Sequence, residues 1–252
     1  MTISLEIPVF SPSSALHAQA LGAQRIELNA QGSYAVGGTT PTLADLKGVT
    51  KWLMVPVRVM IRPRGKPSAD EPDFVYTDDE FATMLEDVAA FRGVLSGERG
   101  DGFVFGVLKA AGAGFAVDVE RNSRLVEAAG GLACTFHRAF DEVIREGEAP
   151  TIAEGVRDLI GCGFAGVLTS GGPGNAAANR KALEAVVREA SATTRGLEVI
   201  VGGGVRKENV GEVVGGFGDG VWAHSSCFTG KCEEGQVDDE EAMGILERLS
   251  EK

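Results

Sequence analysis

The sequence has few cysteines, which limits both disulfide bonding and thiolate metal sites. Its 252 residues include only four, and no two of them form a Cys-x-x-Cys pair: Cys134, Cys162, Cys227 and Cys232. Free thiols in a reducing compartment are the simpler interpretation. Cys227 and Cys232 could form a metal cluster with His224, but four residues separate the two cysteines and a fourth ligand is missing nearby.

Long apolar runs and an excess of cationic residues are also missing. No apolar run approaches the ~20 residues that span a bilayer, and the N-terminus lacks the basic, apolar, small-residue order of a signal peptide. Lys and Arg number 24 against 36 Asp and Glu, for a formal net charge of -12. Because phosphate backbones and anionic lipids attract clustered Lys and Arg, we expect no nucleic-acid partner and no membrane partner. These features together predict a cytoplasmic protein.

Short β-rich runs alternate regularly with helix-like stretches along the chain. The β-rich runs lie at 3–10, 24–30, 55–62, 102–108, 132–138, 164–170, 197–203 and 218–226. The helix-like stretches lie at 12–22, 41–52, 78–95, 118–129, 151–161, 175–193, 206–215 and 238–250. This order predicts an α/β protein, the (β/α)8 TIM barrel, whose eighth unit could be irregular or shortened. An open doubly wound sheet usually has fewer units or a longer chain. No linker divides the sequence, so residues 1–252 are predicted to form a single domain.

Several sequence signals mark where the predicted helices begin and end. "TDDE" at 77–80 and "TIAE" at 151–154 fit capping boxes, and Pro41 fits the first turn of a helix. Left-handed C-caps are expected where a glycine precedes a strand, at Gly22, Gly130 and Gly163.

Polar residues gather at the predicted carboxyl ends of the strands, where this fold places its functional sites. They are Arg62 and Arg64 after the third strand, His137, Arg138 and Asp141 after the fifth, Thr169 and Ser170 after the sixth, Gly202, Gly203 and Gly204 after the seventh, and His224, Ser225 and Ser226 after the eighth. The glycine N–H groups, a helix starting near Arg206 and the serine hydroxyls would suit a small anion such as phosphate. Alternatively, the glycines only permit tight turns.

Two acidic residues lie inside predicted strands, where both faces are normally covered. Glu6 and Glu27 would need partners there, because an unpaired buried carboxylate is costly. The available cations are Arg58, His137 and Arg138. This placement allows two interpretations. The glutamates could belong to a structural ion-pair network, or a Glu and a His could form a general acid/base pair. Since adjacent strand residues face opposite ways, we expect one of His137 and Arg138 to face the barrel interior and the other the helices.

Several of these motifs together resemble the CutC copper-homeostasis family. They are "LEI" (5–7), "RIEL" (25–28), "GGTTPTL" (37–43), "IRPRG" (61–65), "FHRAFD" (136–141), "LTSGG" (168–172), "GGGVR" (202–206) and "HSS" (224–226). The resemblance runs in order over nearly the whole chain. It implies a cytosolic TIM barrel that forms a dimer or higher oligomer, a role in copper homeostasis with copper(I) as the candidate bound ion, and a polar pocket.

One departure from the family pattern affects the expected copper site. Many members carry Cys after "LEI" and after the second strand's "EL", and those thiols are proposed to hold copper. Here the two positions are Pro8 and Asn29, which cannot supply the soft thiolate that copper(I) prefers. A CutC-like copper-homeostasis protein is therefore the first hypothesis, with copper as a candidate cofactor.

The alternative hypothesis is a TIM-barrel enzyme that acts on a small anionic or phosphorylated metabolite. Its acid/base candidates are Glu6, Glu27, His137 and Asp141. Its ligand-binding candidates are Arg62, Arg64, Arg138, Thr169, Ser170, Gly203, Gly204, His224, Ser225 and Ser226. The expected partners are a small polar or anionic ligand and further copies of the chain in a homo-oligomer.

Overall fold

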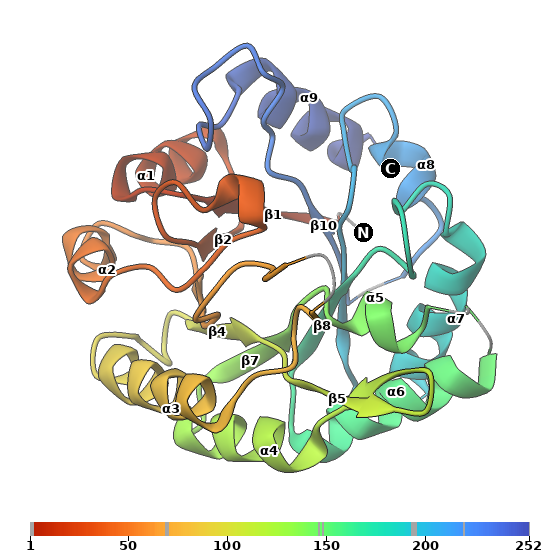
Figure 1. Cartoon of the computed structure of the whole chain (residues 1–252). Coiled ribbons are helices and arrows are strands. Elements are labelled where there is room, and N and C mark those ends of the chain that lie inside the picture. The colour runs from red at the N-terminus through yellow and green to blue at the C-terminus, as the bar shows by residue number, and fades with distance from the viewer. Residues whose placement is uncertain are drawn as a thin grey trace.

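Parallel strands close into one barrel, surrounded by helices (Figure 1). The computed structural model describes residues 3–68, 71–145, 147, 149–192, 196–218 and 220–251. The barrel strands are β1 (Ser4–Val9), β2 (Arg25–Leu28), β3 (Val57–Met60), β4 (Gly102–Phe105), β7 (Ala133–Phe136), β8 (Gly166–Thr169), β9 (Glu198–Val201) and β10 (Val221–His224). They follow the order β1-β10-β9-β8-β7-β4-β3-β2, so the first and last strands close the barrel. The predicted TIM-barrel fold is confirmed.

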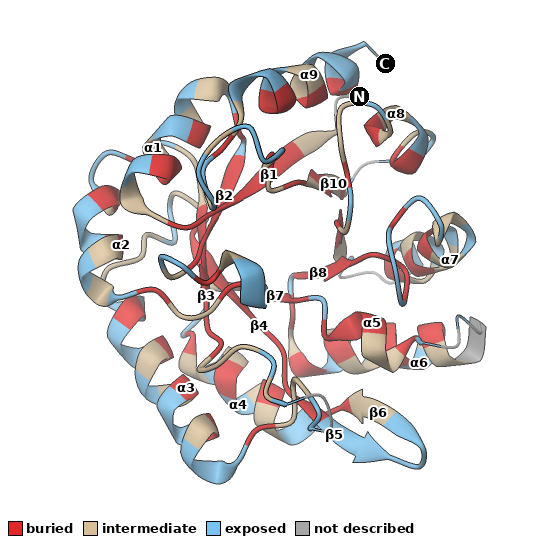
Figure 2. Ribbon diagram, turned by 45° about the horizontal axis from the view of Figure 1, so that its top comes forward, coloured by how far each residue is buried: buried red, intermediate tan, exposed pale blue. Residues whose placement is uncertain are grey.

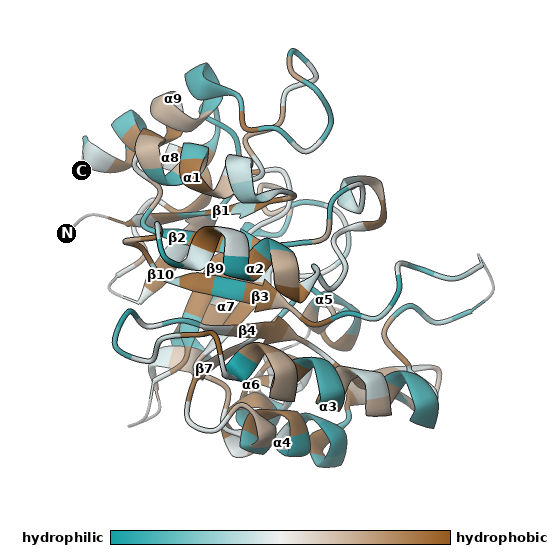
Figure 3. Ribbon diagram, turned by 90° about the vertical axis from the view of Figure 1, so that its left-hand side faces the viewer, coloured by the Kyte–Doolittle hydropathy of each residue, from teal (hydrophilic) through white to brown (hydrophobic). Residues whose placement is uncertain are grey.

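The helices of the barrel pack one apolar face on the strands. They are α1 (Pro12–Leu21), α2 (Leu43–Thr50), α3 (Asp78–Arg92), α4 (Val119–Ala128), α6 (Ala149–Cys162), α7 (Arg180–Ser191), α8 (Val210–Val213) and α9 (Asp239–Ser250). In α7, for example, Leu183, Val186 and Ala190 are buried, a spacing that puts them on one side of the helix. Figure 2 shows these buried stripes facing the buried strands, and Figure 3 shows the mixed hydropathy of the helices. In the described residues, no helix has the length and apolar character needed to cross a membrane.

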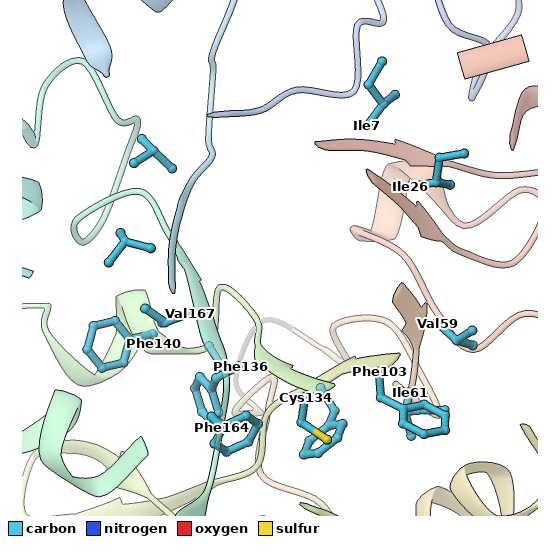
Figure 4. Packing of buried hydrophobic residues seen from close by; sticks show 14 of the residues in the cluster. Ile7, Ile26, Val59, Ile61, Phe103, Cys134, Phe136, Phe140, Phe164 and Val167 are labelled. Carbon is cyan, nitrogen blue, oxygen red and sulfur yellow. The ribbon is translucent and has the colours of Figure 1, made fainter. Parts of the chain in front are cut away.

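Aromatic side chains fill part of the space between barrel and helices. Phe164 lies with its ring centroid 5.2 Å from that of Phe105 and 5.2 Å from that of Phe136. Phe136 also contacts Phe140 edge to face at 6.5 Å. Figure 4 shows Phe136, Phe140 and Phe164 packed beside Val167. These rings are fully buried and anchor the strand that leads into the "FHRAFD" motif.

The helix boundaries confirm some of the capping predictions and correct others. The capping box of α3 pairs Thr77 with Glu80, as predicted. The box predicted at 151–154 is wrong, because α6 begins at Ala149 and the segment lies inside the helix. The predicted start at Pro41 is also wrong, because Thr42 and Asp45 form the capping box of α2. The expected left-handed glycines are confirmed, with φ of 107° at Gly22, 63° at Gly130 and 94° at Gly163.

Three features depart from the regular alternation that the sequence predicts. An antiparallel hairpin, β5 (Leu108–Ala111) with β6 (Gly114–Val117), follows β4. A short helix, α5 (Phe140–Val143), follows β7, and a 3-10 turn, η1 (Tyr34–Val36), follows β2.

The predicted helix over 206–215 is reduced to the four residues of α8, because glycines at 211, 215 and 216 weaken it. The seventh unit, and not the eighth, is therefore the shortened one. Residues 193 and 219, at the edges of a predicted helix and a predicted strand, lie outside the described residues.

Candidate functional site

A cavity of about 610 Å³ opens at the carboxyl ends of the barrel strands. Its lining includes most of the residues predicted for the site, namely Glu27, Arg62, His137, Arg138, Asp141, Gly203, Gly204, His224, Ser225 and Ser226. Four predicted residues do not line it: Glu6, Arg64, Thr169 and Ser170. The structure therefore brings together predicted residues from β2, β3, β7, β9 and β10 and the loops after them, as the barrel topology requires.

Glu6 lies directly beneath the cavity between two cationic partners. The parallel register places it opposite Arg25 on β2 and opposite His224 on β10. Arg25 donates from Nε to Glu6 and, at 2.6 Å, from Nη1 to Glu198. His224 Nδ1 lies 2.7 Å from Glu6 Oε1. The barrel register thus decides which cations Glu6 meets.

The predicted cationic partners of Glu6 and Glu27 are wrong. Arg58 instead donates to the carbonyl oxygen of Gly100 at 2.5 Å. His137 and Arg138 follow β7, which in the barrel order is separated from β1 and β2 by other strands on both sides. Sequence reasoning overlooked Arg25, although it directly precedes "IEL", because its partner depends on strand register.

The charges around Glu6 shift its pKa and that of His224 in opposite directions. Burial by itself would raise the pKa of Glu6, but the Arg25 charge and the His224 hydrogen bond outweigh burial and hold the pKa far below its usual range. Burial by itself would lower the pKa of His224, but the hydrogen bond to Glu6 and the charge of Glu27 raise it above its ordinary value. The pair therefore favours a carboxylate and an imidazolium, with Nδ1–H donated to Glu6.

Glu27 faces the cavity with one oxygen unpaired. Its Oε1 accepts a hydrogen bond of 3.0 Å from Asn29 Nδ2, whereas Oε2 is buried without a partner. Burial raises the pKa of Glu27, and the negative charge of Glu6 adds to the rise while His224 opposes it. Asn29, at one of the positions where family members carry Cys, thus orients a carboxyl group in the cavity.

His137 is a neutral imidazole and not a partner of either glutamate. Its Nδ1 accepts a hydrogen bond of 3.2 Å from the Ala139 amide, so the ring proton lies on Nε2. That Nε2 is buried without a partner. Burial, helped by the positive charge of Arg62, lowers the pKa of His137 to about 3. Both His137 and Arg138 line the cavity, contrary to the expectation of opposite faces, because β7 ends at Phe136 and both residues lie in the loop beyond it.

We expect this buried neutral histidine to make stability depend on pH. The unfolded chain protonates His137 near pH 6.5, whereas the folded chain keeps it neutral down to about pH 3. The unfolded state then binds the extra proton, so the free energy of unfolding falls as the pH is lowered between these values. Urea unfolding at pH 7, 5.5 and 4.5 should therefore show a shallower fall for His137→Asn than for the unchanged protein. His17→Gln, at an exposed histidine, is the control, and equal slopes for all three proteins would contradict the assignment.

Asp141 is the centre of a hydrogen-bond network that fixes the neighbouring loops. It accepts hydrogen bonds from Thr169 Oγ1 at 2.5 Å, from the Ser170 amide at 2.9 Å and from Ser170 Oγ at 2.7 Å. Arg138 Nε donates to it at 2.9 Å, and Arg138 Nη2 donates to Ser170 Oγ at 3.0 Å. Thr169 and Ser170 therefore hold Asp141, which positions the half-exposed guanidinium of Arg138 at the cavity rim.

The two arginines after β3 mainly form hydrogen bonds and ion pairs that hold neighbouring loops in place. Arg62 Nη1 donates to the carbonyl oxygens of Val36 and Gly38, both at 2.7 Å, and Nη2 donates to Asp73 at 2.9 Å. Arg64 binds Glu80 at 2.5 Å and the carbonyl oxygen of Asp73 at 2.8 Å, and it lies outside the cavity lining. Arg62 reaches the cavity, where it acts as a fixed positive charge.

The glycine loop after β9 faces the cavity without the predicted helix terminus. Gly203 and Gly204 have φ of 92° and 79°, a conformation that favours glycine. Their amides have no backbone acceptor among the described residues. The positive end of a helix does not point at them, because α8 begins only at Val210 and has four residues.

The two serines after β10 differ in how far they are already bonded. Ser225 Oγ donates to the carbonyl oxygen of Val205 at 2.8 Å and accepts from Arg206 at 3.3 Å. Within the described part of the chain, Ser226 Oγ accepts a long hydrogen bond of 3.5 Å from the Phe228 amide and donates none. Ser226 is therefore the serine whose hydroxyl hydrogen is available to a ligand.

An aromatic wall of the cavity was missed by sequence reasoning. Phe10, Tyr34 and Phe74 all line the cavity. Tyr34 packs edge to face on Phe10 at 5.3 Å, and Phe74 packs on the His137 ring at 4.8 Å. Phe10 directly follows β1, which is the one sequence signal that could have indicated it. Arg206 and Asp73 also line the cavity and were not predicted as ligand contacts.

The cysteines do not reach the cavity. None lines it, and all four are free. Burial raises the pKa of Cys134 and of Cys227 to about 12, which opposes thiolate formation. The Cys227, Cys232 and His224 alternative finds no support among the described residues, where the group of donor atoms within 4.8 Å of one another consists of Glu6, Glu27 and His224. Oxygen and nitrogen donors are not the soft set that copper(I) prefers.

Fold and site together define a TIM-barrel protein with buried acidic and imidazole groups at the mouth of the barrel. The chain belongs to the CutC family, whose model matches residues 3–228. The family protein CutC of Salmonella enteritidis PT4 is 40% identical over 207 residues, which cover 82% of this chain and 73% of that protein. This result confirms the resemblance that the sequence motifs indicated.

Solved structures agree with this assignment. CutC from Streptococcus agalactiae, provisionally described as a copper homeostasis protein, is 30% identical with a TM-score of 0.74 and covers 89% of this chain and 98% of its own. Phosphoribosylanthranilate isomerase from Thermotoga maritima has a TM-score of 0.58 at 10% identity, covering 99% of this chain and 100% of its own. The second similarity concerns the fold alone.

Proposed function

We propose that this protein takes part in copper homeostasis without storing copper(I) on thiolates. Its support is family membership and the description of the Streptococcus agalactiae relative. The observation against a thiolate site is that Pro8 lines the cavity and Asn29 binds Glu27, at the two positions where thiols would be needed. The role in copper handling would then depend on the cavity.

A growth experiment tests the copper role. A bacterium deprived of its own CutC protein is grown on increasing copper with this chain, with its Glu27→Gln variant, or with neither. We expect the unchanged chain to restore growth and the variant to fail, because Glu27 carries a buried carboxyl oxygen without a partner on the cavity lining. Failure of the unchanged, expressed chain to restore growth would refute the copper role.

Copper(I) titration tests the thiolate part of the proposal separately. A variant with Cys134→Ala and Cys227→Ala should compete with a copper(I) chelator as well as the unchanged protein does, within about twofold. The reason is that both thiols are buried and their pKa values are about 12. A tenfold loss of copper(I) affinity in a variant that remains folded by circular dichroism would contradict this expectation.

We also propose that the cavity is an active site that performs acid–base chemistry on a small anionic metabolite. The observation that favours this second function is Glu27 Oε2, a buried oxygen without a partner that faces the same cavity as His224. Glu6 holds His224 Nδ1 at 2.7 Å, which orients the rest of the ring. A buried carboxyl group with a raised pKa beside an oriented imidazole is a typical acid–base arrangement.

The anionic part of the ligand would bind where donors remain available. These are the guanidinium of Arg138, the amides of Gly203 and Gly204, and the hydroxyl of Ser226, all on the cavity lining. Arg138 lies close to this loop, since a side chain at Gly203 would come within 3.5 Å of its guanidinium carbon. Positively charged and backbone donors on one side of a cavity suit a phosphate or carboxylate.

Binding of inorganic phosphate tests this site. Isothermal titration should show that Arg138→Gln weakens phosphate binding by about tenfold or more, the usual loss for a charged hydrogen bond. Arg188→Gln is the matched control, because Arg188 is exposed and pairs with Glu189 at 3.4 Å, and neither residue lines the cavity. Equal affinities in the two variants would contradict the proposed anion site.

We propose a cytoplasmic homo-oligomer as the working state. Four free cysteines suit a reducing compartment. Trp52 and Met54 expose 59% and 82% of their surface beside each other in sequence, an apolar surface that a second copy could cover. Light scattering of the unchanged protein and of Met54→Lys would test the assembly, and a monomeric unchanged protein would refute it.

A further inference from the structure

Two residues that line the cavity carry unpaired polar atoms of complementary kind. Glu27 Oε2 is a buried acceptor without a donor, and His137 Nε2–H is a buried donor without an acceptor. Both residues are at least 95% buried and both line the cavity. Leaving either group unpaired costs about 1–3 kcal/mol. A ligand that offers a hydrogen to Glu27 and an oxygen to His137 would satisfy both.

We propose that the cavity catalyses proton transfer at a carbon atom next to a carbonyl group of a small anionic metabolite. This inference rests on the proposed acid–base function and narrows it to one reaction class, enolisation. Glu27 is the base that removes the proton, and His137 is the donor to the carbonyl oxygen. Arg138 and the glycine loop bind the anionic end.

The reaction transfers one proton between the substrate and Glu27. It involves no net oxidation or reduction. Glu27 Oε2 takes the proton from carbon, and the C–H electron pair becomes the C=C bond of the enolate. The carbonyl π pair moves onto oxygen, which accepts the hydrogen bond from His137 Nε2–H. The proton held by Glu27 exchanges with solvent in a fraction of turnovers, and Glu27 then returns a proton or deuteron to the same carbon, or to the neighbouring one if the enolate has first moved a proton between its oxygens. No external acid, oxidant or metal is required.

A neutral imidazole suits this step better than an imidazolium. Because the Ala139 amide is bonded to Nδ1, the remaining proton is fixed on Nε2, which is left without a partner. Pre-positioned neutral donors of this kind stabilise an enolate in other enzymes whose histidine pKa is strongly lowered. The Arg62 charge near the ring further favours negative charge on the carbonyl oxygen.

The surroundings of Glu27 support its role as the base. His224, paired with Glu6, carries positive charge close to Glu27 and so favours its carboxylate before the reaction. Asn29 holds Oε1, which leaves Oε2 as the oxygen that can accept a proton. Glu6 and Asn29 are positioning residues in this scheme, because they act through His224 and Glu27.

The aromatic wall would exclude water from the enolate, which the reaction needs in addition to a base and a hydrogen-bond donor. Phe74 packs on the His137 ring at 4.8 Å, and Tyr34 with Phe10 closes another part of the lining. Apolar walls around a reactive enolate protect it from solvent and strengthen the hydrogen bonds it accepts.

Hydrogen–deuterium exchange tests the inference. The whole chain is incubated in D₂O with dihydroxyacetone phosphate or, separately, with pyruvate, and the loss of the C–H signals is followed by proton NMR. We expect exchange at least 100-fold faster than in buffer with the phosphorylated probe. Glu27→Gln should slow it by about 100-fold or more, as removal of a general base does. His137→Leu should slow it similarly, and His137→Gln, which keeps an N–H donor, should recover part of the rate.

The controls separate the possible failures. Lys181→Gln, an exposed substitution on α7, should exchange the probe like the unchanged protein. A contaminating isomerase would give the same rate in the Glu27→Gln sample, so equal rates there overturn the inference. Binding of dihydroxyacetone phosphate, measured by phosphorus NMR, or of pyruvate, measured by saturation-transfer proton NMR, without any exchange overturns the enolisation and leaves the anion-binding acid–base site standing. If neither probe binds and neither exchanges, the result overturns both the enolisation and the anion-binding acid–base site.

Discussion

Replacing Arg25 with Leu should lower the free energy of unfolding by about 3–5 kcal/mol, the usual effect of removing one partner of a buried ion pair. Arg25 and Glu6 expose only 3% and 2% of their side chains, and Arg25 also binds Glu198 at 2.6 Å. Without the guanidinium, Glu6 stays buried with only His224 as a partner. Urea unfolding followed by circular dichroism at pH 7 measures the effect.

Two further variants show whether the loss comes from the buried charge. Arg25→Leu combined with Glu6→Leu removes both charges and should recover part of the lost stability. Arg145→Gln removes the exposed partner of Glu142 and should change stability by less than about 0.5 kcal/mol. If Arg145→Gln cost as much as Arg25→Leu, burial would not be the reason for the effect.

Gly102→Ala should be the most damaging change of a single methyl group in the barrel. A Cβ atom at Gly102 would lie 1.9 Å from the carbonyl oxygen of Ala133, which is backbone of the neighbouring strand β7. Backbone cannot rotate away as a side chain can, so the barrel must open locally between β4 and β7. Because overpacking usually costs about 1–3 kcal/mol and this contact is with backbone, we expect a loss of at least about 3 kcal/mol in urea unfolding.

Gly48→Ala is the matched control for this prediction. Gly48 lies in α2, and a Cβ atom there would meet nothing within 4 Å. Alanine in place of glycine inside a helix raises stability by about 0.5–1 kcal/mol. The two substitutions add the same methyl group, so opposite signs are expected. A Gly102→Ala protein as stable as the unchanged one would show that the β4–β7 contact is looser than described.

The location of the site was predictable because it depends on topology more than on packing. Parallel strands that alternate with helices bring their carboxyl ends to one mouth, and His137, His224 and Gly203 lie at the carboxyl ends of predicted strands. The roles of several residues were not predictable in this way. Asp141 and Ser170 bind each other, and Arg64 binds Glu80, because short loops fold these side chains onto one another.

The acid–base assignments required the structure for a related reason. Glu6 and Glu27 look alike in the sequence, each flanked by apolar residues, yet the structure gives them opposite pKa shifts. Glu6 has a guanidinium beside it, whereas Glu27 has an amide and an open cavity. Which environment each carboxyl group meets depends on the neighbours across the barrel, which local sequence does not encode.

The sequence by itself determined the barrel, the family and the end of the barrel at which polar groups gather. The barrel follows from a strand–helix pattern that repeats about every thirty residues. The family and the polar end follow from motifs that occur one after another at successive strand ends. Only the tertiary structure decided that Arg25 and His224 flank Glu6, that Asn29 orients Glu27, and that His137 is neutral. The contacts of Glu6 join residues 19 and 218 positions apart, so their physical cause is strand register at barrel closure. Asn29 and His137 depend instead on how the chain beyond β2 and β7 is buried.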